Sequence, residues 1–254
     1  MSIYFENEKA KVLRPTNKNH RPGSLSTVFT EEQLDILASV MHVKKYSAST
    51  HLFWEGDEAN AVYWILKGRV KIRKSTNEGK DLILSILQPD DMIADIDSFD
   101  TSHRYTAEAI DHVEVGIITR LQLEMLMIKY GDFAYRYAMW MGLIQRKTET
   151  KLRDLLMGGK NGALASTLIR LCNSFGEKNM DGHIRIDIKL TNNELAELVG
   201  TTREGVNRLL ASLKKDGVLT TEGNGYITVV NTDTLKDMAG CPLCPTCPKE
   251  ICRL

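Results

Sequence analysis

The sequence has no long hydrophobic run, no net charge and no segment typical of an export signal. No stretch of about 18 apolar residues occurs in the 254-residue chain, which argues against a membrane-spanning helix. The first 22 residues contain no apolar segment of signal-peptide length, so we expect a cytoplasmic protein. Because 33 basic residues balance 33 acidic ones, the total charge gives no indication of a nucleic-acid partner.

Catalytic motifs are also missing. The sequence holds neither a glycine-rich phosphate-binding loop nor a nucleophile elbow, and its six histidines show no metal-ligand spacing. We therefore expect a protein that is not an enzyme. Cysteine is absent until Cys172, and four of the five cysteines lie at or after Cys241. In a reducing cytoplasm such a cluster indicates metal or redox chemistry rather than disulfides.

What is present divides the chain into five segments and predicts an α+β fold. Residues 1–24 are mildly basic and contain prolines, which is typical of a flexible arm. Residues 25–130 hold a short amphipathic helix and then short alternating strands between turns, which predict an antiparallel β-roll of the cupin-like jelly-roll type, here a sensor domain. Residues 131–158 predict a long helix, 159–236 predict helices followed by a hairpin, and 237–254 form a cysteine-rich tail.

The helix predicted from Gly131 to Met157 indicates self-association. Its candidate contact residues recur at steps of three and four, and they are Ala134, Tyr137, Met141, Ile144, Thr148, Lys151 and Leu155. The alternative is that this face packs on its own roll. Because the helix is long and the roll is small, we favour a homodimer.

The segment from Thr191 to Lys215 predicts a helix-turn-helix. Thr191 and Glu194 have the spacing of a capping box for the first helix, and Gly200 supplies the turn. The second helix has apolar residues at i, i+3, i+4 and i+7, namely Val206, Leu209, Leu210 and Leu213. A hairpin around residues 223–225 follows. This order is that of a winged helix-turn-helix.

The outer face of the second helix suits the major groove of double-stranded DNA. Its predicted contact residues are Thr202, Arg203, Glu204, Asn207, Arg208 and Lys214. Arginine can bond guanine twice, glutamate can accept from cytosine, and asparagine can pair with adenine. Thr201 and Glu204 also have capping-box spacing, so Glu204 could instead cap its own helix. The helix is locally basic although the chain is neutral, and we predict that it binds DNA.

The tail carries the strongest chemical signal. Its cysteines follow the pattern C-x2-C-x2-C-x4-C at Cys241, Cys244, Cys247 and Cys252. Four thiolates could hold a structural zinc ion, or the compact run with interleaved prolines could hold an iron–sulfur cluster. Zinc sites more often pair two knuckles across a longer loop, so the spacing favours the cluster. A redox enzyme would need a second cofactor site, and the sequence shows none.

The stretch TTREGVNRLLASLKKDGVL resembles the recognition helix of CRP/FNR-type bacterial transcription regulators, and the resemblance covers nearly all of residues 25–236. It implies a dimer that binds a palindromic operator with TGTGA-like half-sites and works with RNA polymerase. In that family the residues matching Glu204, Asn207 or its neighbours, and Arg208 read bases. The cyclic-AMP-binding members have Gly-Glu and Arg-Ser pairs where this chain has Ala94-Asp95 and Arg104-Tyr105. We therefore expect no cyclic nucleotide in the roll.

The tail is similar to that of the Bacillus-type FNR regulators, which carry a [4Fe-4S] cluster near the C-terminus. The resemblance implies Cys244, Cys247 and Cys252 as ligands and Asp154 as the fourth, with Cys241 as an extra thiol that could replace or supplement it. It also implies oxygen-responsive control, mainly activation, of anaerobic respiration genes. Without the resemblance, Asp154 is an ordinary solvated helix residue beside Lys151 and Arg153. The competing hypothesis keeps DNA binding but gives the chain a zinc tail and a small-molecule effector in the roll.

Overall fold

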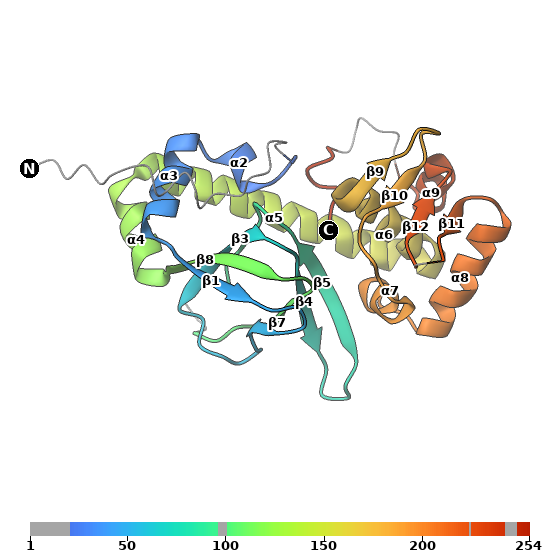
Figure 1. Cartoon of the computed structure of the whole chain (residues 1–254), viewed down its shortest axis with the longest axis horizontal. Coiled ribbons are helices and arrows are strands. Elements are labelled where there is room, and N and C mark those ends of the chain that lie inside the picture. Colours follow the sequence, from blue (N-terminus) through green and yellow to red (C-terminus); the bar gives the residue numbers. More distant parts are fainter. Residues whose placement is uncertain (1–20, 96–100, 224, 242–247) are drawn as a thin grey trace, which may run out of the picture. The chain divides into compact units, whose positions relative to one another are not determined.

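The computed structural model describes residues 21–95, 101–223, 225–241 and 248–254 (Figure 1). The chain divides into two compact units. The first holds the residues up to Gly142 except 80–83, and the second holds 80–83 and the residues from Leu143 onward. Within the described residues, no helix combines the length and the apolar character that crossing a membrane requires.

Two four-stranded sheets form the body of the first unit. One sheet has the order β1-β8-β3-β6, with β1 (His42–Tyr46), β8 (Val113–Thr119), β3 (Ala61–Lys67) and β6 (Met92–Ile93). The other has the order β2-β7-β4-β5, with β2 (His51–Phe53), β7 (Thr106–Ala109), β4 (Val70–Ser75) and β5 (Asp81–Leu87). The pairings of β8 with β1 and β3, and of β7 with β2 and β4, are antiparallel, which confirms the predicted β-roll.

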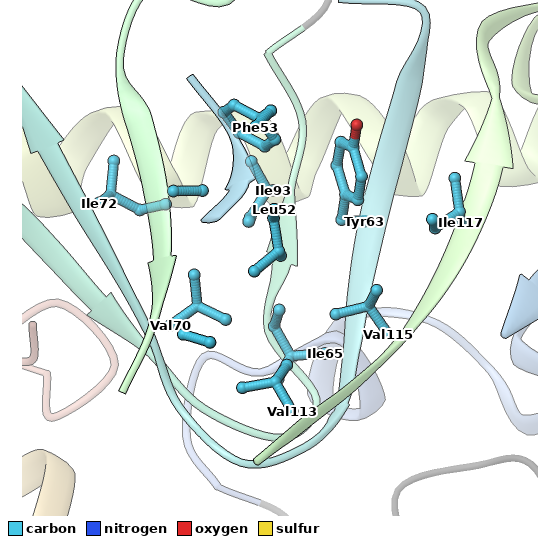
Figure 2. Close-up of a cluster of buried hydrophobic side chains, with 12 residues drawn as sticks. Leu52, Phe53, Tyr63, Ile65, Val70, Ile72, Ile93, Val113, Val115 and Ile117 are labelled. Atoms are coloured by element: carbon cyan, nitrogen blue, oxygen red, sulfur yellow. The ribbon is translucent and has the colours of Figure 1, made fainter. Parts of the chain in front are cut away.

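The core of the roll is built from side chains of both sheets. Figure 2 shows Phe53 and Val70 from one sheet and Tyr63, Ile65 and Val115 from the other pointing into a shared interior. The side chains of a strand point alternately to its two faces, so the alternating apolar pattern gives each sheet one face for this core.

Helices flank the strands of the first unit. They are α2 (Leu25–Val28), α3 (Glu31–Val40) and α4 (Arg120–Lys129). Thr30 caps α3 and Thr119 caps α4, each in a complete capping box. The chain is already fixed at Arg21, whose guanidinium bonds the carbonyl oxygen of Pro89 and lies 3.4 Å from the Asp91 carboxylate. The prediction of a flexible arm is therefore wrong for residues 21–24, and residues 1–20 lie outside the described part of the chain.

Helix α5 (Gly131–Met157) has the predicted length, and its predicted contact seam is only partly exposed. Most of the seam is half-buried within the chain itself, at Ala134, Tyr137, Ile144, Lys151 and Leu155. The exposed residues form a different line at alternating steps of three and four, namely Tyr135, Ala138, Gly142, Gln145, Glu149, Leu152 and Leu156. Which of the two lines pairs in a dimer stays a prediction, because the sequence pattern does not say which apolar side chains the rest of the chain covers.

The second unit is built around α6 (Gly159–Phe175), which contacts α7, α8, α9, β9 and β10 (Figure 1). The other helices are α7 (Asn192–Val199), α8 (Arg203–Lys215) and α9 (Thr232–Met238). One antiparallel sheet has the order β11-β12-β10-β9, with β11 (Leu219–Thr221), β12 (Ile227–Val229), β10 (Ile184–Ile186) and β9 (Gly176–Lys178). The predicted winged helix-turn-helix, and with it the α+β fold class, is confirmed.

Close packing of α9 on α6 depends on a glycine. A Cβ atom added to Gly162 would lie 3.0 Å from the carbonyl oxygen of Met238 at the end of α9. This approach brings the chain that leads into the cysteine tail beside the start of α6. The break between α5 and α6 is the predicted pair Gly158-Gly159, and Gly159 has a positive φ of 58°.

Candidate functional site

The first helix of the helix-turn-helix begins and ends as predicted. The Thr191 hydroxyl accepts a hydrogen bond from the Glu194 amide at 3.2 Å, and the Glu194 carboxylate accepts one from the Thr191 amide at 2.9 Å. Gly200 ends α7 in the left-handed conformation, with φ 71° and ψ 38°. This turn directs the chain into α8.

The start of α8 decides between the two predicted roles of Glu204, which were reading a base and capping its own helix together with Thr201. Thr202, in extended conformation, is the N-cap, and its hydroxyl accepts a hydrogen bond from the Gly205 amide at 3.2 Å. The Thr201 hydroxyl is buried and has no partner among the described residues. The alternative capping pair of Thr201 and Glu204 is therefore wrong. The reason is that α8 begins at Arg203, with Thr202 as its N-cap, which is one residue later than a cap at Thr201 requires.

The predicted base-contacting face of α8 is exposed. Val206, Leu210 and Leu213 are buried, and Leu209 is half-buried. The predicted contact residues on the opposite face are all exposed, namely Thr202, Arg203, Glu204, Asn207, Arg208 and Lys214. Glu204 is free of the capping role, so its carboxylate can accept a hydrogen bond from a base.

A groove of about 580 Å³ lies beside this face, between α8 and the hairpin of β11 and β12. Lys189 and Lys214 line it, together with Asn192 and Asn207. The Asn192 amide donates to the Asn207 side-chain oxygen, which fixes the Asn207 amide. Lys189 and Asn192 are not among the predicted contact residues, because both lie outside the recognition helix. Their only sequence signal was their position just before and at the start of α7.

Asp154, the fourth predicted cluster ligand, is nearly buried in the last turn of α5. Its side chain is 7% exposed. One oxygen, Oδ1, accepts from Arg153 Nε at 3.0 Å and Nη2 at 2.6 Å. The other, Oδ2, accepts from Ser166 Oγ at 2.7 Å and Arg170 Nη2 at 2.7 Å. The picture of a solvated helix residue beside Lys151 and Arg153 is wrong except for its contact with Arg153.

The same contacts keep Asp154 ionised. Burial by itself raises the pKa of the carboxyl, but hydrogen bonds from Ser166, Arg170 and Arg153 outweigh burial and lower the pKa. A deprotonated carboxylate is the form that can bind a metal. At neutral pH, Asp154 is therefore an anion held by two arginines.

A hollow of about 380 Å³ opens beside Asp154. Its walls are Arg153, Asp154, Met157 and Gly158 on one side and residues 237–240 on the other. Residues 237–240 lead directly into Cys241, whose amide donates to the Lys236 carbonyl at 2.9 Å. The start of the cysteine tail and the proposed carboxylate ligand thus share one hollow.

The end of the tail is fixed to α6. The Asn173 amide donates to the Cys252 carbonyl at 2.7 Å, and the Leu254 amide donates to Ser174 Oγ at 3.0 Å. Ile251 is buried. Cys252 is thereby held on the same helix that supplies Ser166 and Arg170 to Asp154.

The predicted set of four ligands is only partly described. Cys244 and Cys247 lie outside the described residues. Within those residues, no three His, Cys, Asp or Glu side chains gather closely enough to hold a metal ion. The thiols of Cys241 and Cys252 and the buried carboxylate of Asp154 are the donor types of the predicted cluster. Burial raises the pKa of the Cys172 thiol to about 12, so Cys172 does not supply a thiolate.

The roll contains an internal ion pair between Asp95 and Arg104. These residues stand where the cyclic-AMP-binding members of the family have the Glu of the Gly-Glu pair and the Arg of the Arg-Ser pair. The Arg104 guanidinium donates to Asp95 Oδ1 through Nε at 2.9 Å and Nη2 at 2.8 Å. His103 lies within 3.4 Å of the same carboxylate and stacks on Phe53. Burial by itself raises the pKa of Asp95, but these hydrogen bonds lower it. The guanidinium edge that could grip a ligand phosphate is occupied by the protein's own carboxylate.

Comparison with known proteins agrees with this architecture. Residues 43–130 match the cyclic nucleotide-binding domain family, and residues 162–238 match the Crp-like helix-turn-helix domain family. The anaerobic regulatory protein of Bacillus subtilis is 38% identical over 92% of this chain and 97% of its own length. The chain belongs to the CRP/FNR family of transcription regulators. The family predicted from the recognition helix is therefore confirmed, and the Bacillus relative agrees with the predicted subgroup.

More distant relatives agree on the fold. The cAMP-activated global transcriptional regulator CRP of Salmonella typhimurium is 28% identical over 78% of this chain and 94% of its own. The structure of FixK2 from Bradyrhizobium japonicum has a TM-score of 0.70 at 22% identity, covering 78% of this chain and 97% of that one. A CooA mutant from Carboxydothermus hydrogenoformans has a TM-score of 0.70 at 23% identity, covering 89% and 98%.

The comparisons settle the broad function. The relatives are DNA-binding transcription regulators, and members of the family act as dimers. The prediction that this chain is not an enzyme is confirmed.

Proposed function

We propose that this regulator is oxygen-responsive and mainly activates anaerobic respiration genes, through a [4Fe-4S] cluster held by Cys244, Cys247, Cys252 and Asp154. The observation that carries the proposal is the hollow that Asp154 shares with the chain entering the cysteine tail. The Cys252 carbonyl accepts a hydrogen bond from Asn173 of α6, and Arg170 of the same helix donates to the Asp154 carboxylate. The name of the Bacillus subtilis relative, an anaerobic regulatory protein, supports the same biology.

The two oxygens of Asp154 differ in how easily they become available to iron. Oδ2 is held by Ser166 and by the buried Arg170, whose side chain is 3% exposed. Oδ1 is bonded by Arg153, whose side chain is 49% exposed and can turn into solvent. We expect Oδ1 to be the ligand atom, with Arg153 displaced. When bound, the cluster supplies iron and sulfide that react with oxygen.

The end of α5 connects this site to DNA binding. Asp154 lies three residues before the end of the long helix, and the tail lies against α6 of the DNA-binding unit. A cluster with ligands from both segments would fix the DNA-binding unit relative to the dimer helix. In this proposal, the fixed arrangement places two recognition helices at the spacing of a palindromic operator with TGTGA-like half-sites.

Base reading is assigned to α8. We expect Arg203, Glu204, Asn207 and Arg208 to contact base edges, while Thr202 and Lys214 contact the phosphate backbone. Their exposure supports this assignment, as does the groove beside them, whose charged lining residues are Lys189, Lys214 and Glu222. RNA polymerase is the expected protein partner.

The homodimer is proposed to form along the exposed line of α5. Tyr135, Leu152 and Leu156 are 67%, 55% and 73% exposed. Ala138 and Gly142, on the same line, would let two helix backbones approach closely. The alternating steps of three and four are those of a coiled-coil seam.

The test is purification of the full chain without oxygen, with iron, sulfide, zinc and the visible spectrum recorded. The proposal predicts equal iron and sulfide and a loss of operator affinity in air. Cys247→Ala should abolish the cluster, whereas the matched control Cys172→Ala should keep it, because Cys172 is a buried core residue of α6 and not a predicted ligand. A colourless protein with stoichiometric zinc and no iron after reconstitution would contradict the proposal and favour a zinc tail with an effector in the roll.

A further inference from the structure

Arg170 is a buried cation that joins two segments distant in the sequence. The residue is 2% exposed, in the middle of α6. Its Nη2 donates to Asp154 Oδ2 at 2.7 Å. Its Nη1 donates to the carbonyl oxygens of Ile251 at 3.0 Å and Arg253 at 3.2 Å. One guanidinium therefore bonds the end of α5 and the backbone on both sides of Cys252.

These bonds are stronger and more directional than ordinary surface contacts. A buried arginine must find a partner for its charge, and Asp154 supplies it. The planar fork of a guanidinium presents its donors at fixed angles, so Asp154 and the tail backbone are held at fixed positions relative to each other. A lysine has one ammonium and cannot reproduce this geometry.

Neighbouring residues of α6 hold the same stretch of the tail. Asn173 donates to the Cys252 carbonyl at 2.7 Å, and Arg253 Nη2 donates to the Ser174 carbonyl at 3.3 Å. Four consecutive tail residues, 251–254, thus have backbone or side-chain hydrogen bonds to α6. Cys252 lies inside this anchored stretch, between two carbonyls that Arg170 binds.

One donor of Arg170 remains unused within the described residues. Its Nε is buried and has no hydrogen-bond partner there. A buried donor without an acceptor is unfavourable and requires an explanation. An anionic group bound beside Asp154 and Cys252 would supply an acceptor, and sulfur atoms of iron–sulfur clusters accept such hydrogen bonds.

We propose that Arg170 is the positioning residue of the tail. It fixes the Asp154 carboxylate and the chain around Cys252 in one arrangement before any metal binds. The part of this inference that concerns the cluster rests on the proposed function, whereas the docking of residues 248–254 does not. Loss of the guanidinium should release the tail in the metal-free protein and weaken the retention of iron in the loaded one.

The test compares Arg170→Gln and Arg170→Lys with the wild-type full chain. Arg185→Gln is the matched control, since Arg185 forms ion pairs with Asp187 and Glu222 in the same unit and, within the described chain, has no hydrogen bond to residues 248–254. Amide hydrogen exchange of residues 248–254 is measured in metal-free protein. We expect exchange roughly tenfold faster or more in Arg170→Gln, because charged hydrogen bonds are lost. Arg170→Lys should be intermediate, and Arg185→Gln should match the wild type.

A second readout separates this inference from the proposed function. Iron release to a chelator is timed in anaerobic, reconstituted protein, and circular dichroism confirms folding. Unchanged exchange of residues 248–254 in a folded Arg170→Gln or Arg170→Lys protein overturns the positioning role. If wild-type protein takes up no iron, the proposed function fails while the exchange result still decides the docking. If wild type and Arg170→Gln retain iron equally, the link to the cluster fails and the proposed function stands.

Discussion

Replacing Asp154 with alanine should destabilise the second unit even when no metal is present. The substitution leaves the Arg170 guanidinium buried without its carboxylate, since Arg170 is 3% exposed and Asp154 is 7% exposed. Removing one partner of a buried ion pair costs about 3–5 kcal/mol. The contact with the half-exposed Arg153 adds at most about 1 kcal/mol. We therefore expect a loss of about 3 kcal/mol or more in the free energy of unfolding.

The assay is chemical denaturation of metal-free protein at neutral pH, followed by circular dichroism. Asp154→Asn should cost less, because its amide keeps an oxygen that can accept from Ser166 or Arg170. Asp187→Ala is the matched control, since Asp187 forms a surface ion pair with Arg185 and should matter by less than about 1 kcal/mol. An Asp154→Ala protein whose free energy of unfolding lies within about 0.5 kcal/mol of the wild-type value would refute the reasoning.

Repeating the denaturation at several pH values tests the Asp154 contacts a second time, through the pH dependence of the free energy of unfolding. The folded pKa of Asp154 lies below the unfolded value of about 3.9. Its contribution to stability is therefore fully present above the unfolded pKa and is lost as the pH falls through the folded pKa. Asp154→Asn should lack this part of the acid destabilisation. An acid limb identical to that of wild type would show that the carboxylate is not bonded as described.

Three further predictions concern DNA binding and assembly. Arg208→Ala should weaken operator binding by about 1–3 kcal/mol and relax preference at one base pair in fluorescence anisotropy; equal losses on all sequences would remove it from base reading. Lys189→Ala should weaken binding to all sequences and lower the slope of affinity against salt by about one, and an unchanged slope would contradict a phosphate contact. Leu152→Asp should give monomers in analytical ultracentrifugation, whereas a retained dimer would mean that another face of α5 pairs.

The sequence predicts the fold well wherever the signal is local. The capping pair at Thr191 and the left-handed Gly200 lie within a few residues of what they determine, and both are as expected. The three-residue strand β9 and the short helix α9 were missed. Neither has enough residues to show a period, and tertiary contacts with β10 and α6 stabilise them instead.

The candidate sites also contain residues that local sequence patterns predict and residues whose surroundings only the tertiary fold determines. The outward residues of α8 follow from helical periodicity, so they could be predicted from the apolar positions Val206, Leu210 and Leu213 alone. The environment of Asp154 could not, because Ser166 and Arg170 lie on another helix and only the fold brings them to its carboxylate. The dimer seam stays a prediction for a related reason, since periodicity identifies faces of α5 but not which face the chain itself covers.

The ligand set at the tail is tested most directly by Mössbauer spectroscopy of iron-57 protein reconstituted without oxygen. Our account predicts a [4Fe-4S] spectrum in which one iron differs from the other three, because Asp154 supplies oxygen where the cysteines supply sulfur. That difference should disappear in Asp154→Cys. Four equivalent thiolate-bound irons in the wild-type protein would show that Cys241, not Asp154, is the fourth ligand, and protein that binds only zinc would contradict the cluster itself.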